Sequence, residues 1–311
     1  MKKIELHLHL DGSLDIDYAK ELTGRNVYDQ MVSSRDGSLA QYLEKFYLPD
    51  ELMTDYNVIV EFSYRLAKQL EKEDVIYAEI RFCPTSHNKK ISVDRVITGI
   101  REGLAKVPTV KTNLIFCMRR NYTFDENLEI IKLAKKYLGN GCCAIDLVGD
   151  EASYQTKYFE ELFEIARDWG IPFTIHAGEV GSYESVLEAI KFGAKRIGHG
   201  IRSIDDMNTI NELKKHKVFL EVCPDSNLDT KAVYSIGDHP IRGLVDLGVN
   251  VTISTDNRTV SNTSLDNEYN LLKKYLGFTD EDILNFNLNA IEAAFISETE
   301  KQELRDRLLD K

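Results

Sequence analysis

The sequence predicts an α/β protein built as one (β/α)8 TIM barrel, and three observations support this. Eight short apolar segments typical of strands recur along the 311 residues. Amphipathic helical patterns such as VDRVITGIREGLAKV separate most of them. After a longer first interval, the strand-like segments follow one another at roughly 20–40 residues, which suits this barrel. A doubly wound open sheet also alternates strands and helices, but the number of strands favours the barrel.

The predicted strands are listed here in chain order. They lie at residues 3–10, 75–83, 110–119, 143–149, 171–177, 196–200, 218–223 and 249–255. The whole chain, residues 1–311, reads as a single domain, and the segment from Asp280 onward is expected to form two extra C-terminal helices.

The long first interval, residues 12–74, predicts a helical insertion after the first strand. Such an insertion lies on the C-terminal face of the barrel, where active sites of this fold are found. Within it, Leu39, Tyr42, Leu43 and Phe46 share one helical face. Residues 39–50 could therefore act as a lid, and the same face could equally pack on the barrel.

Composition and charge narrow the class of protein. The chain is 43% apolar and 29% charged, which is typical of a soluble globular protein, and its net charge of −12 argues against nucleic-acid and anionic-membrane partners. No apolar stretch approaches the roughly 20 residues of a membrane span. Five cysteines without a CxxC pair indicate reduced thiols and a cytoplasmic location. No feature of the sequence indicates an obligate protein partner.

The first strand carries the strongest chemical signal. Ile4, Leu6, Leu8 and Leu10 alternate with Glu5, His7, His9 and Asp11, so the polar set is expected to point into the barrel. Barrel interiors are normally filled by branched aliphatic side chains. Two inward histidines separated by one residue can converge on a metal ion, although a hydrogen-bonded histidine pair would have the same pattern.

Other strand ends favour the metal. His176 ends the fifth strand, His199 ends the sixth and Asp256 follows the eighth. Three histidines and a carboxylate around an open water position make a plausible catalytic zinc shell. The predicted ligands are His7, His9, His176 and Asp256. The fourth strand holds no lysine that could bridge two metals, so one Zn2+ per chain is expected.

The remaining histidines and one glutamate complete the expected arrangement. Glu179 follows His176 by three residues and can reach a substrate without binding the metal. His199 would lie beside the metal-bound water. His216 and His239 stand in helix or loop contexts and are expected at the surface, whereas the setting of His87 is open.

Seven segments in order resemble the adenosine deaminase family, a branch of the metal-dependent amidohydrolases, over nearly the whole chain. They are KIELHLHLDGSL, EIRFCPTSH, DLVGDE, FTIHAGE, RIGHG, VCPDSNLDTKAV and STDNRTVSNTSL. The resemblance implies zinc-dependent hydrolytic deamination of adenosine, and of 2′-deoxyadenosine, to the inosine product and ammonia. The implied partner is a small purine nucleoside.

The resemblance also implies the roles of individual residues. Glu179 matches the proton donor to purine N1, and His199 the residue that orients and deprotonates the attacking water, which Asp256 helps to orient. Asp11 matches an acceptor for a ribose hydroxyl, and Gly149 a backbone donor to the purine ring. His9 matches a position at the substrate edge of the pocket as well as a zinc ligand.

Two positions depart from the family pattern. Asn257 stands where the family often has an aspartate that meets purine N7, and an amide donates to N7 at any pH. Cys83 replaces a small residue, which concerns pocket packing. Two other functions stay open from the sequence: an adenine deaminase of the same family, and a catalytically inactive nucleoside-binding relative.

Overall fold

Eight parallel strands form the centre of the computed structural model, which describes residues 1–35 and 39–310 and leaves the side chains of residues 39 and 40 undescribed. All eight predicted strands are present. They are β1 (Lys3–His9), β2 (Val75–Phe82), β3 (Lys111–Arg119), β4 (Cys142–Val148), β5 (Thr174–Ala177), β6 (Arg196–His199), β7 (Phe219–Val222) and β8 (Asn250–Ile253).

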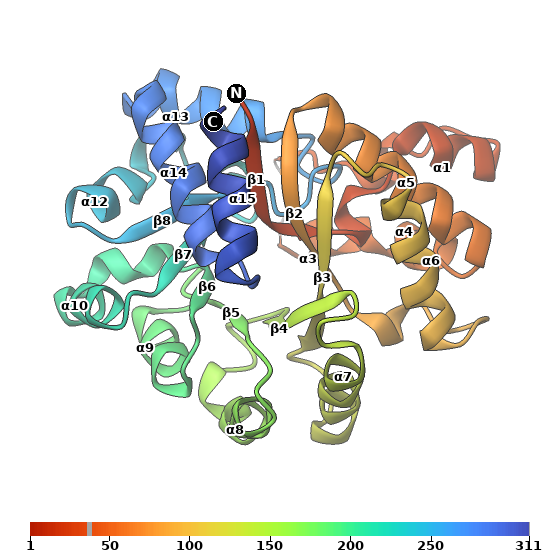
Figure 1. Ribbon diagram of the computed structural model, residues 1–311, viewed down its shortest axis with the longest axis horizontal. Coiled ribbons are helices and arrows are strands. Elements are labelled where there is room, and N and C mark those ends of the chain that lie inside the picture. The colour runs from red at the N-terminus through yellow and green to blue at the C-terminus, as the bar shows by residue number, and fades with distance from the viewer. Residues whose placement is uncertain (36–38, 311) are drawn as a thin grey trace.

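The strands close into a barrel. Regular pairing runs from β1 to β4 and from β5 to β8, always between neighbours in sequence. The two halves join where Ile145 N donates to Pro172 O at 3.0 Å and where Asp256 N donates to His7 O at 2.8 Å. At the chain ends, Lys2 Nζ donates to Arg307 O at 2.8 Å, so the N- and C-termini lie close together, as Figure 1 shows. The predicted (β/α)8 barrel is therefore confirmed.

Helices cover the outside of the barrel in chain order (Figure 1). Those between β2 and β8 are α6 (Val93–Ala105), α7 (Phe124–Tyr137), α8 (Glu160–Asp168), α9 (Tyr183–Phe192), α10 (Met207–His216), α11 (Pro224–Asp229) and α12 (Ile241–Asp246). Side-chain caps fix several of their starts; for example, Thr123 and Glu126 form a reciprocal capping box at α7.

The interval between β1 and β2 is helical throughout most of its length. It contains α1 (Ile16–Thr23), α2 (Tyr28–Met31), α3 (Leu39–Leu43), α4 (Tyr47–Leu52) and α5 (Tyr56–Lys72). Three residues of the predicted lid face, Tyr42, Leu43 and Phe46, line the pocket at the C-terminal ends of the strands. The fourth, Leu39, has its side chain outside the described residues.

Three helices follow β8, and the last two are the pair that the sequence predicts from Asp280 onward. They are α13 (Leu265–Leu276), α14 (Asp280–Ala293) and α15 (Glu298–Leu308), so α13 precedes the predicted pair. Ile4 and Leu6 of β1 pack in one cluster with Ile291 of α14 and Leu304 of α15. The apolar face of β1 thus points outward to these helices, and its polar face points into the barrel.

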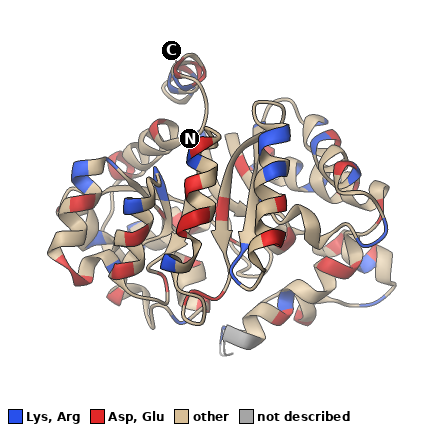
Figure 2. Cartoon of the chain, turned by 90° about the horizontal axis from the view of Figure 1, so that it is seen from below, with Lys and Arg blue, Asp and Glu red and all other residues tan. Residues whose placement is uncertain are grey.

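Surface and cysteine properties agree with the composition. Figure 2 shows acidic and basic residues interspersed along the outer helices. All five cysteines are free and buried. Over residues 1–35 and 39–310, no helix has both the length and the apolar character needed to cross a membrane.

Candidate active site

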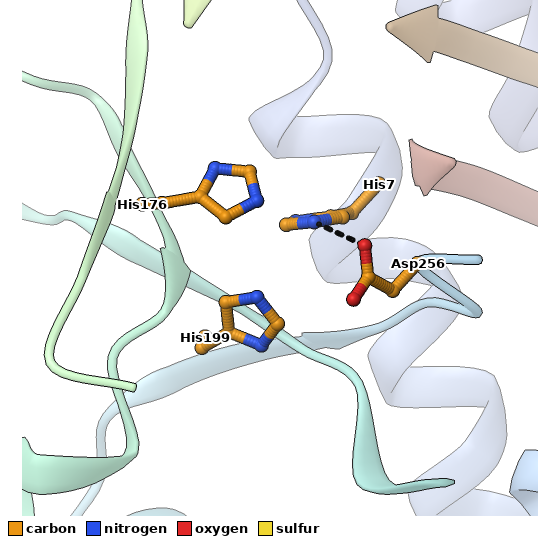
Figure 3. Close-up of side chains that lie close together, drawn as sticks. All are labelled: His7, His176, His199 and Asp256. Carbon is orange, nitrogen blue, oxygen red and sulfur yellow. Dashed lines mark ion pairs between the residues drawn. The ribbon is translucent and has the colours of Figure 1, made fainter. Parts of the chain in front are cut away.

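Five side chains from four strand ends gather inside the C-terminal mouth of the barrel, and Figure 3 shows four of them: His7, His176, His199 and Asp256. Asp256 Oδ1 lies 3.3 Å from the Nε2 atoms of both His7 and His9. His9 Nε2 lies 3.4 Å from His176 Nε2. The structure therefore brings together every residue that the sequence singled out as a ligand.

His199 also lies at this cluster. One ligand atom from each of His7, His176, His199 and Asp256 falls within 4.8 Å of the other three. His9 contacts Asp256 and His176 directly, so position alone does not decide whether His9 or His199 completes a metal shell.

The buried surroundings fix two of these rings. Glu221 Oε2 lies 2.8 Å from His7 Nδ1, and Asp146 Oδ2 lies 3.0 Å from His176 Nδ1. Arg81 contacts both carboxylates, at 2.6 Å and 2.8 Å. A carboxylate on Nδ1 leaves Nε2 free for a metal, as is usual for ligating histidines.

The donor set fits a zinc ion. His7 Nε2 and Asp256 Oδ1 are buried and have no hydrogen-bond partner, although buried polar atoms are normally paired. Imidazole nitrogens with one carboxylate oxygen are the ligands of catalytic zinc sites. Burial by itself would raise the pKa of Asp256, but its close contact with His7 and the charges of the surrounding histidines hold that pKa well below its usual range.

An unusual backbone conformation orients the side chains of two site residues. His199 and Asp256 have φ values of 62° and 58°, in the left-handed region that residues other than glycine rarely adopt. Both stand where a strand ends, and the left-handed turn directs their side chains into the mouth. Such strained positions concentrate at functional sites.

Glu179 stands on the loop after β5, and two neighbouring side chains hold it. Thr230 Oγ1 donates to Glu179 Oε1 at 2.9 Å, and Asn227 Nδ2 donates to the same oxygen at 3.3 Å. Burial, with the nearby charge of Asp256, raises the pKa of Glu179 to about 7. The side chain can therefore carry a proton at neutral pH, as a general acid must.

Glu151 fixes the loop that carries Glu179. Its carboxylate accepts the backbone N–H groups of Gly178 at 2.6 Å, Glu179 at 3.2 Å and Gly181 at 3.0 Å. These contacts join the loop after β4 to the loop after β5.

The expected substrate contacts line the same pocket. Asp11, Gly149 and Asn257 all face it, together with Cys83 and Glu179. Burial, helped by the charge of Asp50, raises the pKa of Asp11 to about 6. Gly149 has a φ of 108°, a conformation that suits glycine. The pocket thus offers a carboxylate, a backbone edge and an amide around one cavity.

The prediction for His239 is wrong. This residue, expected at the surface, is 3% exposed, because the loop before α12 folds back over α11. There its Nε2 lies 3.2 Å from Asn227 Oδ1. His216 is exposed as expected, and His87 is fully buried.

Several residues around the site were not singled out from the sequence: Asp146, Glu151, Glu221, Asn227 and Thr230. Asp146 and Glu221 are each the single charged residue in the otherwise apolar strands β4 and β7. A lone carboxylate within an apolar strand is the signal that could have singled them out.

Known proteins match this chain over nearly its whole length, both in sequence and in structure. A family model described as adenosine deaminase matches residues 2–311. The adenosine deaminase of Haemophilus ducreyi is 38% identical over 322 residues, covering 97% of this chain and 94% of that protein. The crystal structure of an adenine deaminase from Arthrobacter aurescens has a TM-score of 0.89 at 25% identity, covering 99% of this chain and 98% of that one. An amidohydrolase from Burkholderia ambifaria, solved with bound Zn, has a TM-score of 0.88 at 22% identity, covering 100% and 92%.

Proposed function

Because this chain belongs to the adenosine deaminase family, we propose that one zinc ion at the histidine cluster, together with Glu179 and His199, carries its reaction. That reaction is the hydrolytic deamination of adenosine: water replaces the amino group at C6, and inosine and ammonia leave. The proposal includes 2′-deoxyadenosine, which carries the same purine.

The proposed zinc ligands are His7, His9, His176 and Asp256. The two unpartnered buried atoms, His7 Nε2 and Asp256 Oδ1, support this assignment. When bound, zinc supplies the Lewis acidity that makes water nucleophilic at neutral pH. The zinc-bound amidohydrolase with the same fold agrees with this choice of metal.

The observation that carries the proposed function is the buried carboxyl group of Glu179 beside the histidine cluster, whose pKa is raised by burial to about 7. An aromatic purine resists attack at C6 unless N1 receives a proton. Glu179, with a pKa of about 7, can supply that proton at neutral pH. Its Oε2 lies 3.7 Å from His199 Nε2, so donor and water-orienting residue face one small volume.

The other pocket residues position the nucleoside. Asn257 donates to purine N7, the Gly149 N–H donates to the ring, and Asp11 accepts a ribose hydroxyl. His9 borders the purine as well as the metal, and Asp256 helps to orient the attacking water. His199 orients that water from the other side; the family resemblance also assigns it the water's proton.

A substrate panel tests the proposed function. The zinc-loaded protein is incubated with adenosine, 2′-deoxyadenosine and adenine, and the change in purine absorbance is followed. Adenosine should be converted with the highest kcat/KM. A preference for adenine would favour the activity of the Arthrobacter aurescens neighbour, and binding without turnover would favour an inactive nucleoside-binding protein.

We also propose a cytoplasmic location for the enzyme. Its five free, buried cysteines support this, because they suit a reducing compartment.

A further inference from the structure

A chain of directed hydrogen bonds leads from a helix start to the proposed catalytic pair. It begins at Ile241, the first residue of α12, whose backbone N–H has no partner within its own helix. This N–H donates to His239 Nδ1 at 3.2 Å. Because a backbone N–H can only donate, Nδ1 of His239 must accept.

The direction of each following hydrogen bond is then fixed by the one before it. Burial, with a smaller contribution from the charge of His199, lowers the pKa of His239 to about 3, so its ring is neutral and carries one proton. With Nδ1 accepting, that proton is on Nε2, which lies 3.2 Å from Asn227 Oδ1. The amide oxygen therefore accepts, and the amide nitrogen of Asn227 points the other way.

The nitrogen of Asn227 reaches both proposed catalytic side chains. Nδ2 lies 3.1 Å from His199 Nδ1 and donates to Glu179 Oε1 at 3.3 Å. Asn227 is fully buried and the His239 ring nearly so, so water cannot readily take over these contacts. If the amide of Asn227 were reversed, its NH2 group would face the Nε2–H of His239, and two donors would meet. The ring cannot avoid this by moving its proton to Nδ1, because Nδ1 accepts from the Ile241 N–H.

We propose that His239, acting through Asn227, is a positioning residue that keeps Nδ1 of His199 as a hydrogen-bond acceptor and its proton on Nε2. In this form His199 presents a donor to the pocket, where Figure 3 shows its ring beside His7, His176 and Asp256. A protonated nitrogen cannot bind a metal. The relay of Ile241, His239 and Asn227 therefore agrees with the proposed function, in which His9 rather than His199 is the fourth ligand.

The relay also bears on the role of His199. A ring whose Nε2 already carries a proton can donate to the oxygen of an attacking water and so orient it. Acceptance of the water's proton at Nε2 requires the opposite tautomer, which the Ile241 N–H opposes. The relay thus favours the water-orienting role of His199. This consequence rests on the proposed function, whereas the tautomers of His239 and His199 are independent of it.

The first test reads the tautomers directly. The zinc-loaded protein, labelled with 15N in its histidine rings, is studied by long-range 1H–15N correlation, and signals are assigned with His239→Gln and His199→Gln. His239 and His199 should each show the pattern of a neutral ring protonated at Nε2. A pattern of protonation at Nδ1 in either ring overturns the relay, whatever the activity of the protein.

The second test uses a matched pair of variants. In His239→Gln, the side-chain amide can still donate to Asn227 Oδ1; in His239→Leu it cannot. We expect His239→Leu to lower kcat by about tenfold or more, with a smaller change in KM and unchanged zinc content, because Asn227 can then turn its oxygen toward His199. His239→Gln should stay within about threefold of the parent, since its donor is retained.

A double variant separates the relay from simple packing. If His239 acts through Asn227, His239→Leu should cause no further loss of kcat in the Asn227→Ala background. Additive losses, or equal losses in His239→Gln and His239→Leu, would contradict the proposal. If His239→Leu does not fold, the tautomer measurement and the activity of His239→Gln still test the proposal. Failure of the parent protein to deaminate adenosine would instead refute the proposed function and leave the tautomer result standing.

Discussion

The side-chain amide of Asn257 donates a hydrogen bond to the hydroxyl of Tyr42, 2.9 Å away. Asn257 follows β8, and Tyr42 belongs to α3 of the insertion, so this contact joins the two walls of the pocket. Because an amide has two N–H groups, one remains for the substrate. The contact places Tyr42, a residue of the predicted lid, at the pocket wall. Motion of residues 39–50 stays a prediction.

Replacement of Asn257 by aspartate should introduce a new pH dependence. An aspartate must bind a proton before it can donate to N7, so the activity of Asn257→Asp should fall relative to the parent as pH rises. Asn257→Leu should lose activity without that dependence. An adenosine analogue with carbon at position 7 should lower the parent's kcat/KM by roughly 5–150-fold, because a buried donor is left unpaired. A parent-like pH profile of Asn257→Asp, with full activity on the analogue, would remove Asn257 from the N7 contact.

A methyl group added at Gly12 should displace the side chain of Asn257. A Cβ added there would lie 1.9 Å from Asn257 Oδ1, so the amide must move away from both Tyr42 and the substrate. Gly12→Ala should lower kcat/KM on adenosine and the thermal unfolding midpoint. Gly237→Ala is the control, because its added Cβ would meet only Ser235 Oγ at 3.8 Å. Equal behaviour of the two variants would mean that Asn257 is not held as described.

Metal analysis should find about one zinc per chain, as expected of a three-histidine, one-carboxylate site. His176→Ala should lose bound zinc and turnover together. His216→Ala, a change of an exposed histidine on α10, should keep both. Two zinc equivalents that are both required for activity would refute the single-metal site.

Glu179→Gln should keep the fold and the zinc but lose turnover by about 10²–10⁴-fold, because an amide cannot give a proton to N1. Glu184→Gln, a change of an exposed carboxylate a few residues away, should behave like the parent. Near-normal kcat of Glu179→Gln on adenosine would show that another group is the donor.

The pH profile should report the same carboxyl group. The pKa of Glu179 is raised from 4.5 to about 7, and the protonated form is the active one. The kcat/KM of the zinc-loaded protein should therefore fall as pH rises above about 7, by about tenfold per pH unit. Glu179→Gln should lack this decline. A decline of equal size in that variant would assign it to a different group.

The sequence predicts most of the barrel because each strand is a short apolar segment between polar turns. The alternation in β1 also predicts that His7 and His9 enter the barrel, and strand ends of parallel sheets meet at one face, which places His176 and Asp256 beside them. The third C-terminal helix, α13, was not predicted: with Ser264 as N-cap, it begins before the segment assigned to the closing helices.

The burial of His239 could not be predicted in this way. Its neighbours in sequence, Asp238 and Pro240, are typical of exposed turns, and only the return of that loop over α11 covers the ring. The anchoring of His199, at the end of β6, likewise depends on Asn227, which lies in α11 after the next strand. Contacts between separate loops carry no local periodicity, so sequence patterns predict the strand-borne ligands better than the residues that orient them.

The left-handed backbone of His199 and Asp256 has a consequence for how this sequence can change. Each such conformation outside glycine costs about 1–2 kcal/mol, a noticeable fraction of the stability of a typical domain. Glycine at either position would release that strain and end the proposed chemistry in the same step. Selection for a more heat-resistant barrel, applied without selection for turnover, would therefore draw mutations to the catalytic rim.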